Sequence, residues 1–235
     1  MLTYKFDWAV VTSGKYFDWL LSGLKVTLQL SALSIVLAFV LGLALAVMRM
    51  SHVRPVRAFA LAYLELFRNT PLVVQIFFWY FGSNKLLPDV INEWLNATNF
   101  EFAAAVIALT FYTSAFIAED IRSGVLAIPK EQMEAARSSG LSFLQSMRFI
   151  ILPQAVRLTI PPLVNQFLNL AKNSSLAMTI GVAELTYQAR QVESYTFKGF
   201  EAFTAATIVY LGLSLVITGV VHVYNRTVLQ TAGAR

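Results

Sequence analysis

Five long apolar stretches constrain the fold of this chain more than any other feature of its sequence. They run approximately over residues 26–48, 58–81, 102–118, 158–182 and 202–223. A helix needs roughly 20 apolar residues to cross the hydrocarbon core of a bilayer. Unpaired backbone cannot face lipid, and no strand-like alternation recurs over enough segments to form a barrel, so the stretches predict transmembrane helices. We therefore expect an all-α membrane protein with about five transmembrane helices.

The distribution of Lys and Arg predicts the orientation of these helices, because cytoplasmic loops carry an excess of positive charge. Five crossings put the two ends of the chain on opposite sides of the membrane. One side, which includes the C-terminus, holds ten basic residues: Arg49, Arg54, Arg57, Arg122, Lys130, Arg137, Arg148, Arg157, Arg226 and Arg235. The other side holds six: Lys5, Lys15, Lys25, Lys85, Arg190 and Lys198. We therefore expect a periplasmic N-terminal segment at residues 1–20, a membrane domain at 21–225 and a cytoplasmic tail at 226–235.

The composition excludes several other classes of protein. With 57% hydrophobic and 13% charged residues, the chain lies outside the usual balance of soluble domains. Its net charge of +5 is spread along membrane edges, so nucleic acid is not an expected partner. The absence of Cys excludes disulfides and thiolate metal sites, and we expect no metal site. The N-terminus lacks a short apolar core followed by a cleavage site, so we expect it to be retained.

One polar segment, "KEQMEAARSSGLSFLQSMRFIILPQ" at residues 130–154, differs from its apolar surroundings. Residues Lys130 to Ser138 read as a short helix. Gly140 is the expected stop, because glycine just past a helix end adopts the left-handed conformation freely. Ser142 can cap a second helix, which Pro153 is expected to end. The sequence therefore predicts a helix, a glycine turn and a helix on the cytoplasmic surface.

The first of these short helices offers a face with small side chains. Ala135 and Ala136 next to Glu134 would let the backbone of another protein come close, while one acid supplies orientation. The alternative is an ordinary amphipathic helix that rests on lipid headgroups.

Longer patterns favour the first alternative. The order Glu134, Ala135, Ala136, Gly140 and a hydrophobic helix ending at Pro153 resembles the "EAA" loop of ABC-importer permeases. The strings "ELFRNTPLVVQIFFWYFG" (65–82) and "LPQAVRLTIPPLVNQFLNLAKNSSLAMTIGVAEL" (152–185) are similar to signatures of the polar amino acid permeases. The resemblance covers the chain from about residue 20 to 225. Within this family the chain is most similar to the glutamate and aspartate permeases, chiefly through "AKNSSLAMTIG". Permeases for Gln, His or Arg share much of the same sequence.

The resemblance implies a type I ABC importer fold in the bacterial inner membrane. It also implies that this chain is a transport subunit and not an enzyme, with ATP and Mg bound by a partner ATPase. A second permease chain, identical or paralogous, and a periplasmic substrate-binding protein are the other implied partners, with the lipid bilayer around them. The chain has no G-x-x-x-x-G-K-[ST] loop, so any nucleotide binds elsewhere. The residues implied in ATPase coupling are Glu134, Ala135, Ala136, Gly140 and Pro153.

Two other function classes remain open at this stage. A secondary transporter or small channel would often be built from internal repeats, and the two halves of this chain show none. A membrane anchor or assembly protein would have little need for charged residues in the middle of a span.

Polar residues within the spans are candidates for a substrate path, because intramembrane charges are costly and usually functional. Lys172 lies near the middle of the fourth stretch. At 100° per residue, it falls within about 120° of its polar neighbours on one helical face. These neighbours are Asn165, Asn169, Asn173 and Thr179. The ammonium of Lys172 could attract a substrate carboxylate, or it could instead pair with Glu65 and hold helices together.

The second stretch contains two further candidates, Glu65 and Arg68. Arg68 could bind substrate or form a local i,i+3 pair with Glu65. Pro71 removes an intrahelical hydrogen bond, so it is expected to kink or restart the span near Asn69 and Thr70. Such a break often lines the pathway in transporters.

Overall fold

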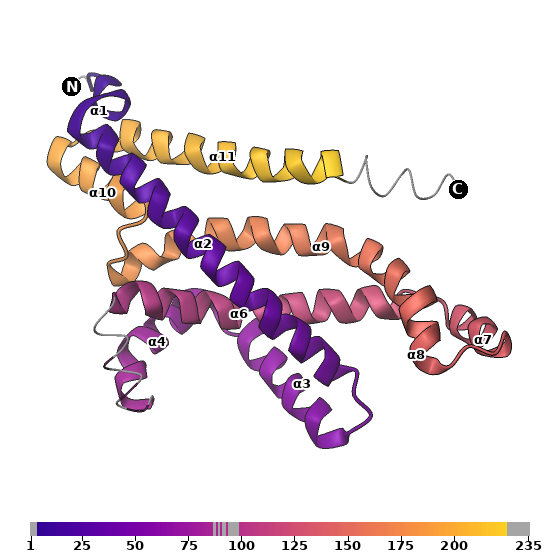
Figure 1. The fold of residues 1–235 in the computed structure, drawn as a ribbon. Coiled ribbons are helices and arrows are strands. Elements are labelled where there is room, and N and C mark those ends of the chain that lie inside the picture. Colours follow the sequence, from indigo (N-terminus) through magenta and orange to yellow (C-terminus); the bar gives the residue numbers. More distant parts are fainter. Residues whose placement is uncertain (1–3, 87, 89, 91–92, 94–98, 225–235) are drawn as a thin grey trace. The chain divides into compact units, whose positions relative to one another are not determined.

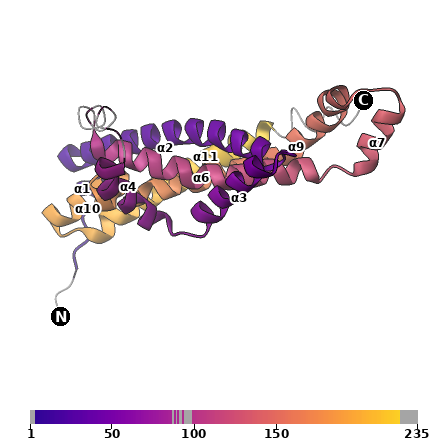
Figure 2. The ribbon, with the colours of Figure 1, turned by 90° about the horizontal axis from the view of Figure 1, so that it is seen from below.

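The computed structural model describes residues 4–86, 88, 90, 93 and 99–224, and these residues form helices without a strand. Figures 1 and 2 show the helices in two views. The helices are α1 (Ala9–Thr12), α2 (Gly14–Arg49), α3 (Arg54–Arg68), α4 (Leu72–Leu86), α6 (Phe100–Leu126), α7 (Lys130–Ser138), α8 (Phe143–Ser146), α9 (Leu152–Asn173), α10 (Leu185–Thr196) and α11 (Gly199–Tyr224). The all-α class predicted from the sequence is confirmed. The predicted tail at 226–235 lies outside the described residues.

Four helical stretches within the described residues are long and apolar enough to cross a membrane. They are Gly14–Arg49, Phe100–Leu126, Phe143–Ile180 and Gly199–Gly219, and Leu72–Gly82 is a shorter apolar helix. Four of the five predicted stretches therefore correspond to continuous helical spans. The second predicted stretch, 58–81, is divided between α3 and α4.

The division of the second stretch occurs where Pro71 was predicted to restart the helix. α3 ends at Arg68 and α4 begins at Leu72. Polar side chains cover the broken end: Asn69 Nδ2 donates to Glu65 Oε2 at 2.7 Å, and Thr70 Oγ1 donates to the Leu66 carbonyl at 2.8 Å. Local side-chain hydrogen bonds thus stabilise the broken end of the span.

The predicted helix stop at Pro153 is wrong. A π-helical segment, Met147–Ile151, follows α8 and leads directly into α9, so Pro153 is the second residue of a long helix. The Leu152 amide donates to the Met147 carbonyl five residues earlier, so the regular α-helical hydrogen bonds are already interrupted just before Pro153 and its missing N–H breaks no regular turn. The helical stretch therefore continues without a break from α8 through the π segment and α9 to Ile180.

The chain divides into two compact units, and the first contains residues from 4–35, 71–109 and 168–220. Its core brings the N-terminal part of the chain against α10 and the start of α11 through seven buried residues: Val11, Leu20, Leu185, Ala189, Val192, Ala202 and Ala206. Thr27 Oγ1 accepts a hydrogen bond from the Leu185 amide at 3.1 Å. A Cβ on Gly23 would lie 2.9 Å from the Leu185 Cα, so the close approach of α2 and α10 requires glycine there.

The second unit contains residues from 36–70 and 110–167. One core cluster joins α2, α3 and α6 through Leu45, Ala46, Ala60, Leu64, Ala115 and Ala118. The hydroxyl of Tyr63 on α3 adds a hydrogen bond to the Phe111 carbonyl on α6 at 3.1 Å. A second cluster, formed by Ile128, Ile151 and Ala155, packs against the Met133 side chain of α7. This second cluster holds the polar 130–154 segment against the ends of α6 and α9.

Candidate functional site

The 130–154 segment has the predicted local structure at its first helix and turn. α7 runs over Lys130–Ser138, as predicted. Gly140 has a φ of 88°, and two hydrogen bonds close the helix end: the Gly140 amide to the Arg137 carbonyl at 3.0 Å and the Leu141 amide to the Ala136 carbonyl at 3.2 Å. This pair of bonds is a Schellman motif, which favours glycine at the left-handed position.

The start of α8 is also fixed by its sequence. Ser142 Oγ accepts from the Gln145 amide at 3.3 Å, and Gln145 Oε1 accepts from the Ser142 amide at 2.8 Å. This reciprocal pair is a capping box, which satisfies two amides that a helix start leaves unpaired. The direction of the chain between α7 and α8 is therefore set by Gly140 on one side and Ser142 on the other.

The three residues expected to contact a partner do not share one environment. Glu134 and Ala135 are exposed, whereas Ala136 is buried. The exposed surface of α7 therefore includes Glu134 and Ala135, whereas Ala136 packs inward. Pro153 is exposed at the start of α9. The role of these residues in coupling stays a prediction.

The polar face of α9 lies in part along an open groove in the first unit. Lys172 lines this groove together with hydroxyl-bearing residues of the segment after α9 and of α11. The groove has a volume of about 390 Å³, and the other lining residues are Ser175, Thr207, Tyr210, Leu211 and Ser214. A cation beside several hydroxyl groups can bind a zwitterion, since the ammonium attracts a carboxylate and hydroxyl oxygens can accept from a substrate ammonium.

The remaining residues of that face are accessible as well. Asn165, Asn169 and Lys172 are exposed, and Asn173 is half-buried. Thr179 lies in a 3₁₀-helix, Ser174–Ile180, that continues α9. Because a 3₁₀-helix has three residues per turn, Thr179 lies two whole turns after Asn173 and stays near the same face. The predicted alignment of the five polar residues is therefore consistent with the backbone.

Glu65 and Arg68 do not form the local pair that their spacing allows. Glu65 accepts from Asn69, and the guanidinium of Arg68 lies 5.5 Å from the centre of the Phe116 ring. In the part of the chain that the structure describes, the one ion pair joins Arg122 to Glu119, with Nη2 to Oε1 at 2.5 Å. The pairing of Lys172 with Glu65 stays a prediction.

Sequence reasoning missed two polar contacts. α6 continues past the predicted end at Ala118, and Asp120 on this extension accepts from Gln166 Nε2 of α9 at 2.8 Å. The string "AEDIR" at residues 118–122 is the signal that could have extended the helix, since Glu and Arg at i,i+3 support helical structure. The pairing partner Gln166 is distant in sequence, so no local pattern indicates it.

The second missed feature is Glu184, which is fully buried between the 3₁₀ segment and α10. Its carboxylate caps α10 by accepting from the Thr186 amide at 2.9 Å and the Tyr187 amide at 2.7 Å. It also accepts from the hydroxyl of Tyr210 at 2.7 Å. Burial raises the pKa of the Glu184 carboxyl, and the hydrogen bonds oppose that shift. Glu184 thus fixes the side chain of Tyr210, which lines the groove beside Lys172.

Comparisons with known proteins agree on one kind of protein. A family model described as "Binding-protein-dependent transport system inner membrane component" matches residues 38–230. The "Probable glutamine ABC transporter permease protein GlnM" of Bacillus subtilis (strain 168) is 45% identical over 85% of this chain and 88% of its own length. The "Glutamate/aspartate import permease protein GltJ" of Escherichia coli (strain K12) is 35% identical over 91% of this chain and 88% of its own length.

A solved structure gives the same result for the fold. It is described as the crystal structure of an amino acid ABC transporter with histidines, and it is 33% identical to this chain with a TM-score of 0.84. The match covers 95% of this chain and 99% of that chain. The fold of this chain is therefore the type I ABC importer fold that the sequence predicted.

Proposed function

Because this chain belongs to the family of inner membrane components of binding-protein-dependent transport systems, we propose that it is the permease subunit of an ABC importer for a polar amino acid. The subunit is a multi-pass membrane protein and not itself an enzyme. Its relatives are named as permeases for glutamine and for glutamate and aspartate. ATP and Mg are bound by a separate ATPase subunit.

The observation that carries this proposal is the geometry of the 130–154 segment. α7 presents exposed Glu134 and Ala135 at its surface, while buried Ala136 and the Met133 side chain tie the helix to the rest of its unit. A short helix that is accessible on one face and packed on the other can transmit a conformational change of a bound ATPase to the ends of α6 and α9. Glu134, Ala135, Ala136, Gly140 and Pro153 are the proposed coupling residues.

The proposed complex contains further subunits. A second permease chain, identical or paralogous, completes the membrane pathway, and a periplasmic binding protein delivers the amino acid. In the proposed topology, residues 1–20 are periplasmic, 21–225 form the membrane domain and 226–235 form a cytoplasmic tail. The ten-to-six distribution of Lys and Arg supports this orientation.

Glutamate or aspartate is the proposed substrate class. The ammonium of Lys172 lies in a groove whose other polar lining groups are hydroxyls, so the groove has a net positive character that suits a second carboxylate. Asn165, Asn169 and Asn173 supply amides along the same path. Glutamine is the second candidate, because the relative with 45% identity is named as a glutamine permease. Uptake of labelled glutamate in competition with unlabelled glutamine separates the two.

Co-purification with the ATPase tests the coupling role directly. Ala135→Trp places a bulky side chain on the exposed face of α7, and it is expected to abolish retention of a nucleotide-binding subunit on the purified permease. Arg137→Trp is the matched control, because Arg137 is exposed on the same helix and points about 160° away from Ala135. Equal retention of the ATPase by both variants would contradict the proposed docking of α7.

A further inference from the structure

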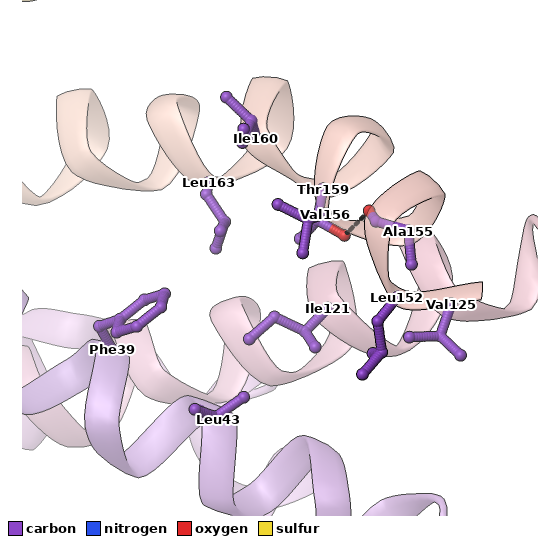
Figure 3. Close-up of a pocket in the computed structure, with 10 residues that line it drawn as sticks. All are labelled: Phe39, Leu43, Ile121, Val125, Leu152, Ala155, Val156, Thr159, Ile160 and Leu163. Carbon is purple, nitrogen blue, oxygen red and sulfur yellow. Dashed lines mark hydrogen bonds between the residues drawn. The ribbon is translucent and has the colours of Figure 1, made fainter. Parts of the chain in front are cut away.

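An apolar groove lies in the second unit, bounded by α2, α6 and α9 (Figure 3). Its volume is about 280 Å³. Ile121 and Val125 of α6 form one side, Phe39 and Leu43 of α2 form another, and residues of α9 between 152 and 163 form the third. Figure 3 shows side chains from all three helices directed toward the shared space.

Two glycines create the groove by bringing α2 and α9 close to α6. A Cβ on Gly42 of α2 would lie 2.6 Å from Ile117 Cγ2, and a Cβ on Gly124 of α6 would collide with Thr159 Oγ1 of α9. Small residues allow such close helix contacts in membranes. Next to these two contact points, the larger side chains of α2 and α9 leave an open channel over α6.

The lining chemistry excludes a polar ligand. All but one of the lining side chains are hydrocarbon, and the exception, Thr159, donates its hydroxyl to the Ala155 carbonyl at 2.8 Å. No polar group of the lining therefore needs a partner from the occupant. An occupant with an exposed polar group would lose its hydration without a replacement hydrogen bond.

The groove is too small to enclose a whole helix, so its size favours a narrower occupant. An α-helix with side chains is about 10 Å wide and rises about 5.4 Å per turn, so a single turn occupies on the order of 400 Å³. That volume exceeds the groove. A single extended hydrocarbon chain is narrow enough to enter and apolar along its whole length.

A basic residue, Arg148, lies in the π segment that precedes the groove-lining part of α9. Arg148 precedes Leu152, which lines the groove, by about one helical turn. Its side chain is exposed, and its guanidinium lies 5.7 Å from the centre of the Phe149 ring. A guanidinium at that position can bind a phosphate oxygen through charge-assisted hydrogen bonds.

We propose that this groove binds one acyl chain of an anionic membrane phospholipid, whose phosphate is held by Arg148. The chain enters from the leaflet on the side of α7 and α8 and lies against Ile121 between α2 and α9. The site is separate from the groove that contains Lys172, because its lining is apolar and it belongs to the other unit.

Photolabelling of the full-length chain in lipid nanodiscs tests this site. The probe is phosphatidylglycerol with a diazirine on the acyl chain, and adducts are mapped by mass spectrometry. We expect adducts concentrated on the lining residues of α2, α6 and α9. Val156→Trp fills the groove from α9, and displacing about two methylene groups of the lipid is expected to lower adduct formation roughly tenfold. Leu43→Trp fills it from α2 and is expected to have the same effect.

Two controls make the result specific. Leu158→Trp adds the same side chain to an exposed residue of α9 that does not line the groove, and it is expected to leave the adducts unchanged. Arg148→Gln is expected to remove the preference for the phosphatidylglycerol probe over the matching phosphatidylcholine probe. The proposal is overturned if adducts are spread evenly over all outward helix faces. Efficient cross-linking of two permease copies through a Cys at Leu43 would also overturn it, since a protein would then occupy the groove.

Discussion

Replacing Gly140 by Val probes the turn that aims α7. Gly140 has a φ of 88°, and a Cβ built on it would have no neighbour within 4 Å. The substitution therefore adds backbone strain without a steric clash. For an L-residue the left-handed conformation costs about 1–2 kcal/mol. That energy lowers the equilibrium constant for the native turn roughly 5- to 30-fold, and the equilibrium constant for docking of α7 in its native position should fall by the same factor.

The assay compares ATP-driven amino acid uptake with membrane insertion of the same variant. We expect uptake by Gly140→Val to fall about tenfold, within the 5- to 30-fold range given by the strain, while insertion stays at the level of the unchanged chain. Gly140→Asn should retain most of the activity, because Asn tolerates the left-handed region. Gly14→Val imposes comparable strain at a φ of 72°, also without a neighbour within 4 Å, but outside the 130–154 segment. Full uptake by Gly140→Val, or an equal loss in Gly14→Val, would refute the reasoning.

Three further substitutions test the substrate path, the orientation and the buried acid. Lys172→Met should lower the affinity for an acidic amino acid about ten- to hundredfold; restored uptake when Glu65→Gln is added would instead make Lys172 structural. In the chain without native Cys, Ser142→Cys should react with an impermeant thiol reagent only from the cytoplasmic side, and labelling from outside would reverse the topology. Burial raises the pKa of Glu184, so the unfolded state loses this proton first and stability should fall as the pH rises from about 4.5. Glu184→Gln removes that titration, and identical pH profiles of thermal unfolding for both proteins would contradict the assignment.

The parts of the fold that the sequence predicted well depend on residues a few positions apart. The bounds of α7, the left-handed turn at Gly140 and the cap at Ser142 each follow from a local hydrogen-bonding pattern. The restart of the second span at Pro71 follows from the missing amide of that residue. These features depend on hydrogen bonds between residues close in sequence and not on tertiary contacts, so the sequence alone can predict them.

The features that sequence reasoning missed depend on contacts between distant segments. Pro153 does not end a helix, because the π segment before it has already replaced the regular α-helical hydrogen bonds at this point. Ala136 is buried through the packing of α7 and not through its own pattern. The bond from Tyr210 to Glu184 joins residues 26 positions apart, and the bond from Gln166 to Asp120 joins residues 46 positions apart. Neither pair has a spacing that one helix or turn could indicate.

The groove lined by Lys172 could be predicted in part from the sequence, whereas the apolar groove could not. The polar stripe that contains Lys172 was visible as a helical periodicity, although the hydroxyl groups of α11 that face it were not. The apolar groove depends on the close approaches at Gly42 and Gly124. In a sequence these are ordinary glycines within apolar helices, so the groove becomes apparent only when three helices are placed together.

ATP-driven uptake of a labelled amino acid tests the central claim most directly. The permease is reconstituted in proteoliposomes with its ATPase subunit and its binding protein, and accumulation of labelled glutamate and labelled glutamine is measured with ATP at the face that binds the ATPase. We predict accumulation of one of these amino acids that requires ATP and is lost in Ala135→Trp but not in Arg137→Trp. Uptake that proceeds without the ATPase and follows an imposed ion gradient would contradict the account.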